Sequence, residues 1–542
     1  MSEQQIHKLD NEHPSSADND RFLKETPAID PPSALATLRK LDTTEGKGLF
    51  TSAGENFNNA IFGRDSLIAS GELLGWDPRI AHEVILTLAT LQGTRNRQKS
   101  DEEPGRIHHE NRNFKTWEAS PLKKAAFEAM SYLWGGNFKE MTTYFSIDAT
   151  PRFILLIADY AKEHPDILGE KVTRGDGQEI TVEQSMVDAT EWIAGHVAES
   201  GLVEVGRHNR IGLIHQTWKD SPTGYIQENG KIANVVEPIA YLNVQTIAAD
   251  SLSAAAGLVF EDRQDQAEHW QTKAETIIQN TVKKFWIEDK QFFAAAIDKD
   301  NLGDERQLQV LQSDAGWMLN SNFFDNLPES DRAKYVSAVV KELFSEDFLT
   351  DVGIRSRALQ YADKLNLADY HGSLVSWPID TYMIAQGLRK QGLPKLAQQL
   401  ESRILNAVNM SGDYYEFFYV QPDGKVLLDP EGAKKDRTNA ENLPIQMYPE
   451  SDIAWTVAAV FMIKLRNGRG TSKDESPIIS DWATQLESDV LTNIKNVQAV
   501  RTIDELSSKY PEQPNIFLDL KEGGKRTAKM IGAQLLAQYL KR

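Results

Sequence analysis

Residues 77–91 read DPRIAHEVILTLATL, and the pattern in this stretch decides the fold. Ile80, Val84, Leu88 and Leu91 recur at helical spacing, which places them on one face of a helix. An Asp followed by a Pro opens the stretch, and these residues are typical start signals of a helix. The spacing therefore predicts an amphipathic helix that begins at Pro78.

The same periodicity recurs along most of the chain. Between Pro31 and Leu465 it predicts about six successive pairs of helices joined by polar loops rich in Gly and aromatic residues. Strand-like stretches are few and short, for example Gly201–Val205. The expected fold is an all-α helical toroid whose loops gather on one face. Further expected helices are Asp65–Trp76, Asp148–Glu163, Gln309–Asn320 and Ser451–Leu465.

Composition changes mark three parts of the chain. Residues 1–30 are polar and acidic, which predicts a loosely attached tail that is neither a signal peptide nor a membrane anchor. Residues 31–466 form the expected toroidal catalytic domain. Residues 467–542 form a linker and a C-terminal helical extension, which ends in a predicted helix over Lys525–Leu540.

The overall balance of charge restricts the possible partners. The 542 residues carry a net charge of −20, and such an acidic surface repels phosphate backbones and anionic lipid. Nucleic acid and membrane are therefore unexpected partners, whereas a neutral carbohydrate remains compatible. The chain has no cysteine, which rules out disulfides and thiolate metal sites and fits a cytoplasmic location. The oligomeric state is left open.

The most informative polar stretch is His215-Gln216-Thr217-Trp218-Lys219-Asp220-Ser221-Pro222. An indole offers a face on which a sugar ring can stack, the ammonium donates hydrogen bonds, and the carboxyl can hold a proton if burial outweighs the nearby Lys. The plain alternative is a capped turn with a surface Asp. The stretch therefore predicts a sugar site only in combination with other polar clusters.

Several other clusters fall at comparable places, before helices or in the loops between them. Each has a plain alternative: a helix cap for Asp65 and Asp148, and core packing for each Trp. His108, His109 and Glu110 lack an obvious further ligand, so hydrogen bonding to a substrate is preferred to metal binding. The candidate substrate-binding residues in these clusters are Arg64, Asp65, His109, Glu110, Asp148, His371 and Trp377.

The clusters together carry a family resemblance. In order along some 400 residues, the chain is similar to the bacterial amylo-α-1,6-glucosidase (glycogen-debranching) family of inverting glycoside hydrolases, which are built on (α/α)6 toroids. The matching stretches are Gly63-Arg64-Asp65-Ser66-Leu67, Glu103-Pro104-Gly105-Arg106-Ile107-His108-His109-Glu110, Asp148-Ala149-Thr150-Pro151, Gln216-Thr217-Trp218-Lys219-Asp220-Ser221, Val244-Gln245, Gly353-Ile354-Arg355 and Tyr370-His371-Gly372-Ser373 with Trp377-Pro378.

The resemblance implies roles for particular residues. Asp220 is expected to be the general acid and Glu416 the general base, with Glu450 as the second candidate for the base. Arg64, Asp65 and Asp148 are expected to hold the terminal sugar, and Trp218 and Trp377 to stack on it. The family motifs also place Lys219 and Gln245 among the substrate-binding residues. The mechanism requires no cofactor and no metal.

The chain departs from the family pattern at a few positions. Tyr415 replaces the Pro before the base, Asn243 replaces a Glu, and a β-rich N-terminal domain found in many relatives is absent. The main expectation is an exo-α-glucosidase of the amylo-α-1,6 type. The alternatives are a hydrolase of a small α-glycoside, such as a disaccharide or a glycosylglycerate, and a carbohydrate-binding toroid without catalysis.

Overall fold

The computed structural model describes residues 33–43, 45–137, 139–259, 263–364, 370–427, 449–469 and 480–509. The chain divides into two compact units, Met1–Pro477 and Ile478–Arg542. The described part of the second unit is the long helix α16 (Asp481–Lys509). The predicted tail over residues 1–30 and the predicted helix Lys525–Leu540 lie outside the described residues.

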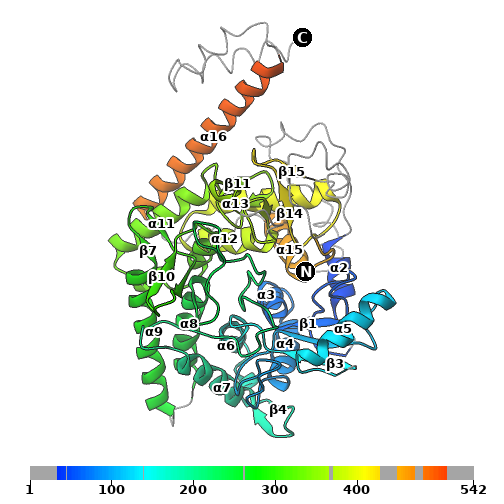
Figure 1. Cartoon of the computed structure of the whole chain (residues 1–542). Helices are drawn as coiled ribbons and strands as arrows, with labels where there is room; N and C mark the ends of the chain where they lie inside the picture. The colour runs from blue at the N-terminus through cyan, green and yellow to red at the C-terminus, as the bar shows by residue number, and fades with distance from the viewer. Residues whose placement is uncertain are drawn as a thin grey trace. The chain divides into compact units, whose positions relative to one another are not determined.

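Helices dominate the first unit, as the apolar periodicity predicts (Figure 1). None of the described helices is long and apolar enough to cross a bilayer. The helices are α2 (Ala34–Leu41), α3 (Gly63–Leu73), α4 (Pro78–Thr90), α5 (Pro121–Leu133), α6 (Ala149–Ala161), α7 (Val182–Gly195), α8 (Leu242–Ala256), α9 (Gln264–Phe285), α10 (Asp314–Trp317), α11 (Glu329–Leu343), α12 (Pro378–Lys390), α13 (Pro394–Ser411) and α15 (Ala454–Arg469). The last of these continues past the predicted domain boundary at residue 466.

The order of helix contacts is that of paired helices around a ring. Helix α3 packs against α6, α6 against α8, α8 against α10, α10 against α12, α12 against α15, and α15 returns to α3. Each of these also packs against a second helix: α4, α7, α9, α11, α13 and α2, respectively. This arrangement is consistent with the predicted toroid.

Apolar side chains join the first and last helices of the first unit. Leu35 and Leu38 of α2, Leu73 of α3, and Val457 and Phe461 of α15 belong to one buried cluster. Each is almost fully withdrawn from solvent, and burial of a side chain of this size stabilises a fold by roughly 1.5–3 kcal/mol. Packing between residues about 400 positions apart therefore completes the ring of contacts.

Short strands lead into several of the ring helices. The strands β1 (Ala60–Phe62), β6 (Ala240–Tyr241) and β13 (Val375–Ser376) run directly, or after one residue, into α3, α8 and α12. In the sheet β1-β2-β3, β2 (Glu110–Asn113) pairs antiparallel with β1 and with β3 (Glu140–Thr143). Because β1 precedes α3 and β3 precedes α6 by a few residues, this sheet brings the N-termini of those helices together.

The remaining strands are short and locally paired. The β10-β9-β6 and β13-β14-β15 sheets and the pairs β4-β5, β7-β8 and β11-β12 join neighbouring loops. The bounds are β4 (Lys171–Thr173), β5 (Glu179–Thr181), β7 (Trp286–Ile287), β8 (Phe292–Phe293), β9 (Ala296–Lys299), β10 (Glu305–Leu308), β11 (Leu349–Thr350), β12 (Gly353–Ile354), β14 (Phe418–Val420) and β15 (Val426–Leu427). Strands are more numerous than predicted, because pieces of two to four residues carry too little alternation to detect.

Two expectations about local structure are wrong. The predicted helix Gln309–Asn320 is only α10 followed by a 3-10 turn over Met318–Asn320, because Gln312 forms a bridge with Arg357 and starts the segment in extended backbone. The predicted strand Gly201–Val205 forms only isolated bridges, in which Val203 meets Val197 and Val205 meets Ile239.

Candidate active site

The site begins at an arginine shared by two carboxylates. Arg64, in the first turn of α3, places Nε 3.1 and 2.9 Å from the carboxylate oxygens of Asp148, which immediately precedes α6. Its Nη1 lies 3.7 Å from Oδ2 of Asp220. The Ser146 hydroxyl donates to Asp148 over 2.7 Å and holds that carboxylate in place. The start of α3, the residue before α6 and the segment that carries Asp220 therefore meet at the Arg64 guanidinium.

Burial raises the pKa of two carboxyl groups near Arg64, those of Asp220 and Asp65. It raises the pKa of Asp220 to about 6, against the opposing charge of Arg64 and with the help of Asp148. It likewise raises the pKa of Asp65 to about 7, again against Arg64. The Asp220 side chain is 25% exposed, so it can receive a ligand from solvent while it retains this affinity.

The second candidate catalytic carboxyl faces the same group. Tyr370 donates a short hydrogen bond to Oε1 of Glu416, which is 6% exposed. Tyr370 also lies within electrostatic range of Asp220 and Asp65. Burial raises the pKa of Glu416 to about 8, against the hydrogen bond from Tyr370 and with the help of the Glu450 and Asp65 charges. The structure therefore brings the predicted acid and base to one place.

The carboxylate of Glu450 is fully engaged by another segment. Its Oε1 accepts hydrogen bonds from Ser52 Oγ at 2.8 Å and from the main-chain amides of Asn56 and Phe57 at 3.0 and 3.1 Å. Its Oε2 accepts from Asn56 Nδ2 at 2.6 Å. Four donors bound to one carboxylate hold it in place and leave little room for a reacting water.

The aromatic residues form a packed wall. Trp218 stacks on Trp317 with centroids 4.9 Å apart, and Trp377 stacks on His371 at 4.7 Å. The indole of Trp218 donates to Asp314 Oδ1, and that of Trp377 donates to the carbonyl of Tyr370. Trp218 and Trp377 are 3% and 2% exposed, so the structure offers almost none of either ring to a sugar. Both rings instead shape the wall behind Asp220.

Lys219 is anchored away from the pocket. Its ammonium forms an ion pair with Asp314 and donates to Gln312 Oε1 at 2.9 Å and to the Ser356 carbonyl at 2.7 Å. Lys219 and Asp314 are both fully buried. Since the protein supplies acceptors for all the ammonium protons, the predicted contact of Lys219 with substrate is not supported. Its position instead fixes the main chain on which Asp220 sits.

Three buried nitrogen atoms beside the acid have no hydrogen-bond partner among the described residues. They are Nη2 of Arg64, Nδ1 of His109 and Nε2 of His371. Burial lowers the pKa of both histidines well below the usual value, with further help from nearby cationic side chains, so both rings are neutral. His371 Nδ1 lies 2.9 Å from Ser221 Oγ, which places the ring next to Asp220. All three atoms are themselves buried, so a sugar hydroxyl could reach them only if the side chains that cover them moved.

Two predicted substrate-binding residues are used within the protein. Glu110 forms a buried ion pair with Arg112, in which Arg112 Nε lies 2.5 Å from Glu110 Oε1. The side-chain oxygen of Gln245 accepts a hydrogen bond from the amide of Val203, and its side-chain nitrogen donates one to the carbonyl of Val203. Both polar atoms of this side chain therefore bind the main chain. Neither geometry supports contact with a substrate. Within the described part of the chain no three His, Asp or Glu side chains form a group that could hold a metal ion.

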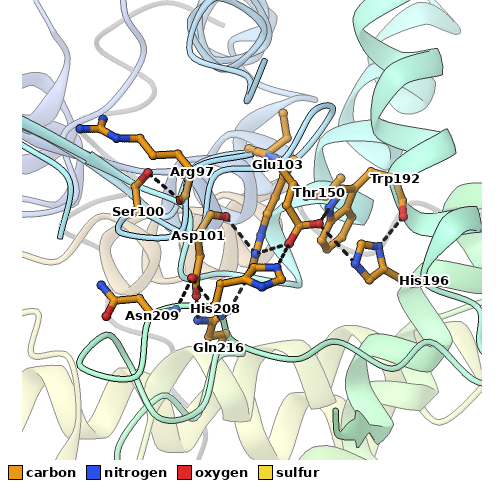
Figure 2. A network of polar contacts seen from close by, with 12 residues as sticks. Arg97, Ser100, Asp101, Glu103, Thr150, Trp192, His196, His208, Asn209 and Gln216 are labelled. Atoms are coloured by element: carbon orange, nitrogen blue, oxygen red, sulfur yellow. Dashed lines mark hydrogen bonds and ion pairs between the residues drawn. The ribbon is translucent and has the colours of Figure 1, made fainter. Parts of the chain in front are cut away.

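The sequence does not predict a polar network that lies behind the site. Figure 2 shows Asp101 between the two loops it joins: its carboxylate accepts from the amides of His208 and Asn209 and from the Gln216 side chain. Asp101 is buried and has a backbone φ of 52°, which is uncommon for a residue other than Gly. The network holds the segment that leads into Trp218 and Asp220. Only the unusual length of the loop over residues 93–120 indicated it.

Tyr370 is the most important residue absent from the predicted site. It lies in the Tyr370-His371-Gly372-Ser373 motif, so the motif could have identified it, but only the structure shows its hydroxyl against Glu416. Arg152 is another such residue. It lies one turn into α6, and its Nε and Nη2 have no partner among the described residues. Its guanidinium carbon lies 5.1 Å from the centroid of the Trp317 ring.

Comparison with known proteins gives a family match over part of the chain. Residues 184–425 match the profile of the mannosylglycerate hydrolase MGH1-like glycoside hydrolase domain. This range contains Asp220 and Glu416. No curated protein sequence matches the chain. The match supports a glycosidase and a carbohydrate substrate.

Solved structures of one enzyme share the fold. The GH63 mannosylglycerate hydrolase from Thermus thermophilus in complex with glucose has a TM-score of 0.50 and 14% sequence identity, covering 79% of this chain and 98% of that one. The same enzyme in complex with Tris and D-glycerate has a TM-score of 0.51 and 12% identity over the same shares. These likenesses support a GH63-like helical fold.

Proposed function

We propose that this protein is an inverting α-glycosidase that hydrolyses a small α-glycoside of the glycosylglycerate class. The observation that carries the proposal is the meeting of Asp220, Asp65 and Glu416 around Arg64 and Tyr370. Asp220, Tyr370 and Glu416 lie within the segment that matches a glycoside hydrolase profile. The mannosylglycerate hydrolase with a similar fold, solved with glucose and with D-glycerate, supports this class of substrate.

In the proposed reaction Asp220 gives its proton to the departing glycosidic oxygen as the bond from that oxygen to the anomeric carbon breaks. Glu416 takes a proton from a water whose oxygen attacks that carbon from the opposite face. The products are the sugar with inverted configuration and the free alcohol. The family resemblance implies that Arg64, His109 and His371 hold the sugar.

Glu416 is a better base than Glu450 on geometric grounds. Among the described residues, only one donor side chain, that of Tyr370, contacts Glu416 at close range, whereas four hydrogen bonds occupy Glu450. A base needs a free lone pair directed at the water. This comparison supports the role that the family resemblance implies for Glu416.

The dependence of activity on pH should be bell-shaped. Asp220 and Glu416 have pKa values raised to about 6 and about 8, so the pair holds one proton between those values. That proton lies mainly on Glu416, so the reactive form, with Asp220 protonated and Glu416 ionised, is the minor one of the two. Below the lower value both are protonated and no base remains, and above the higher value both are ionised and no acid remains. We expect kcat/KM to be highest near pH 7, measured from pH 4.5 to 9.5. A profile that stays flat from pH 5 to 9 would contradict the assignment.

A panel of substrates tests the function. It should contain mannosylglycerate, glucosylglycerate, trehalose, isomaltose and panose, with proton NMR to record the anomer released first. We expect turnover of a glycosylglycerate with release of the inverted anomer. Release of the retained anomer would exclude an inverting mechanism, and failure to hydrolyse any of these glycosides would remove the proposal.

One other function has specific support. The stretch Gly63-Arg64-Asp65-Ser66-Leu67 and the other motifs favour an amylo-α-1,6-glucosidase. The comparisons with known proteins fit the glycosylglycerate class better. Hydrolysis of panose in the panel without hydrolysis of a glycosylglycerate would reverse this preference. Because both catalytic carboxyls are present, a purely carbohydrate-binding role is the least favoured interpretation.

A further inference from the structure

Glu450 connects two parts of the proposed active site. Its carboxylate binds the loop over residues 52–57, as described above, while its main chain is hydrogen-bonded to Glu416, the proposed base. The amide of Glu416 donates to the carbonyl of Glu450 over 2.9 Å. The amide of Glu450 lies 3.4 Å from Oε2 of Glu416, within hydrogen-bond range. One residue therefore holds both ends of Glu416, its backbone and its carboxylate.

The loop held by Glu450 leads directly to the residues that would hold the sugar. It continues into β1, which ends next to Arg64 and Asp65 at the start of α3. The Phe57 ring packs edge-on against Phe62, with centroids 5.2 Å apart, and Arg112 Nη1 donates to the Asn56 carbonyl over 2.8 Å. The loop is thus fixed at both its start and its end.

The contact between the loop and Glu450 is too close for an ordinary side chain. A Cβ atom placed on Gly54 would lie 2.5 Å from Oε1 of Glu450 and 2.7 Å from its Cδ. The main chain of Ala53 also bonds to Asp452, and the amide of Ala454 donates to the Thr51 carbonyl. These contacts form a tight seam between the start and the end of the first unit.

We propose that Glu450 is a positioning residue for the base: its carboxylate and main chain fix Glu416 relative to the segment that carries Arg64 and Asp65. The inference rests on the proposed glycosidase function. In an inverting reaction the base must keep room for one water between itself and the anomeric carbon. A small shift between the two segments would disturb that spacing and reduce turnover more than binding.

The charge of Glu450 has an additional effect on the base. It adds to the forces that raise the pKa of Glu416. Replacing Glu450 with a neutral residue should therefore lower the pKa of Glu416, which is the higher of the two, and move the alkaline limb of the pH profile to lower pH. A residue that only supported the fold would leave that limb unchanged.

The test is Glu450→Gln in the full-length protein. The new amide nitrogen donates and cannot accept from Asn56, so the loop should loosen while the side-chain volume is kept. We expect kcat to fall by about 10-fold or more with KM changed by less than about 3-fold, and the alkaline limb to move to lower pH. Amide hydrogen exchange at Asn56, Phe57 and Glu416 should become faster.

The matched control is Glu401→Gln. Glu401 is 2% exposed and also fully engaged, but by Arg389 and Arg466 on α12 and α15. Its loss should lower stability without moving the alkaline limb. If Glu450→Gln keeps the wild-type kcat, alkaline limb and exchange rates, the inference is overturned while the glycosidase function stands.

Two other outcomes separate the inference from the function. If Glu450→Ala is inactive but is restored by azide, and Glu416→Gln remains active, Glu450 is itself the base and the positioning role is overturned. If the wild-type protein hydrolyses no glycoside, the proposed function fails and the inference about catalysis fails with it. Hydrogen exchange would then still show whether Glu450 holds the loop to Glu416.

Discussion

Replacing Asp220 by Asn should lower kcat by about 100-fold or more while the protein stays folded. The amide cannot protonate the departing oxygen, and the neutral rings of His109 and His371 carry no acidic proton that could replace it. Glu416→Gln should have an effect of similar size, because the amide cannot accept the proton of the attacking water. Steady-state kinetics on the glycosylglycerate hydrolysed by the wild-type protein measures both.

A matched control is available for these variants. Asp250 on α8 is also buried with a pKa raised to about 6, but its carboxylate accepts from the Asn322 amide outside the site. Asp250→Asn should keep nearly normal kcat. The residual activity of Asp220→Asn should lack the alkaline limb of the pH profile, and that of Glu416→Gln the acid limb. Exchanged limbs would mean that the two roles are reversed.

The second large effect concerns stability. Removing one partner of the buried Lys219–Asp314 pair leaves an unpaired charge in the interior, which typically costs about 3–5 kcal/mol. Lys219→Met should therefore lower the free energy of unfolding in urea by about that amount. The double variant Lys219→Met with Asp314→Asn should recover much of the loss, because no buried charge then remains unpaired.

The comparison for this prediction is an exposed pair. Lys171 and Glu179 form a similar contact at 2.8 Å, but their side chains are 64% and 60% exposed. Solvent screens such a pair, so Lys171→Met should have little measurable effect on unfolding. If Lys219→Met were equally harmless, the ion pair would not be holding the segment that carries Asp220.

Sequence periodicity predicted most of the helices but not the site geometry. The helix from Pro78 is observed where Ile80, Val84 and Leu88 place it, and all three are buried. Such patterns are local, so they can be read from one stretch of chain. The shortened α10 could not be predicted, because the bridge between Gln312 and Arg357 joins segments far apart in the sequence.

The sequence motifs predict which residues belong to the candidate site, but not which residues they contact. Arg64, Asp148, Asp220 and Glu416 were chosen from motifs, and the structure places all four in one group. Residue type alone does not show that Lys219, Glu110 and Gln245 bind partners within the protein. Burial and hydrogen bonds decide that, and these depend on segments distant in sequence.

The contact between the last and first ring helices has a consequence for how the protein matures. Glu416 and Glu450 belong to the final fifth of the first unit, while Arg64 and Asp65 are near its beginning. A growing polypeptide would therefore have no working pocket until α15 has docked beside α3. Catalytic turnover would then report completed assembly, because a chain interrupted before α15 contains both carboxyls but lacks the helix that packs against α3.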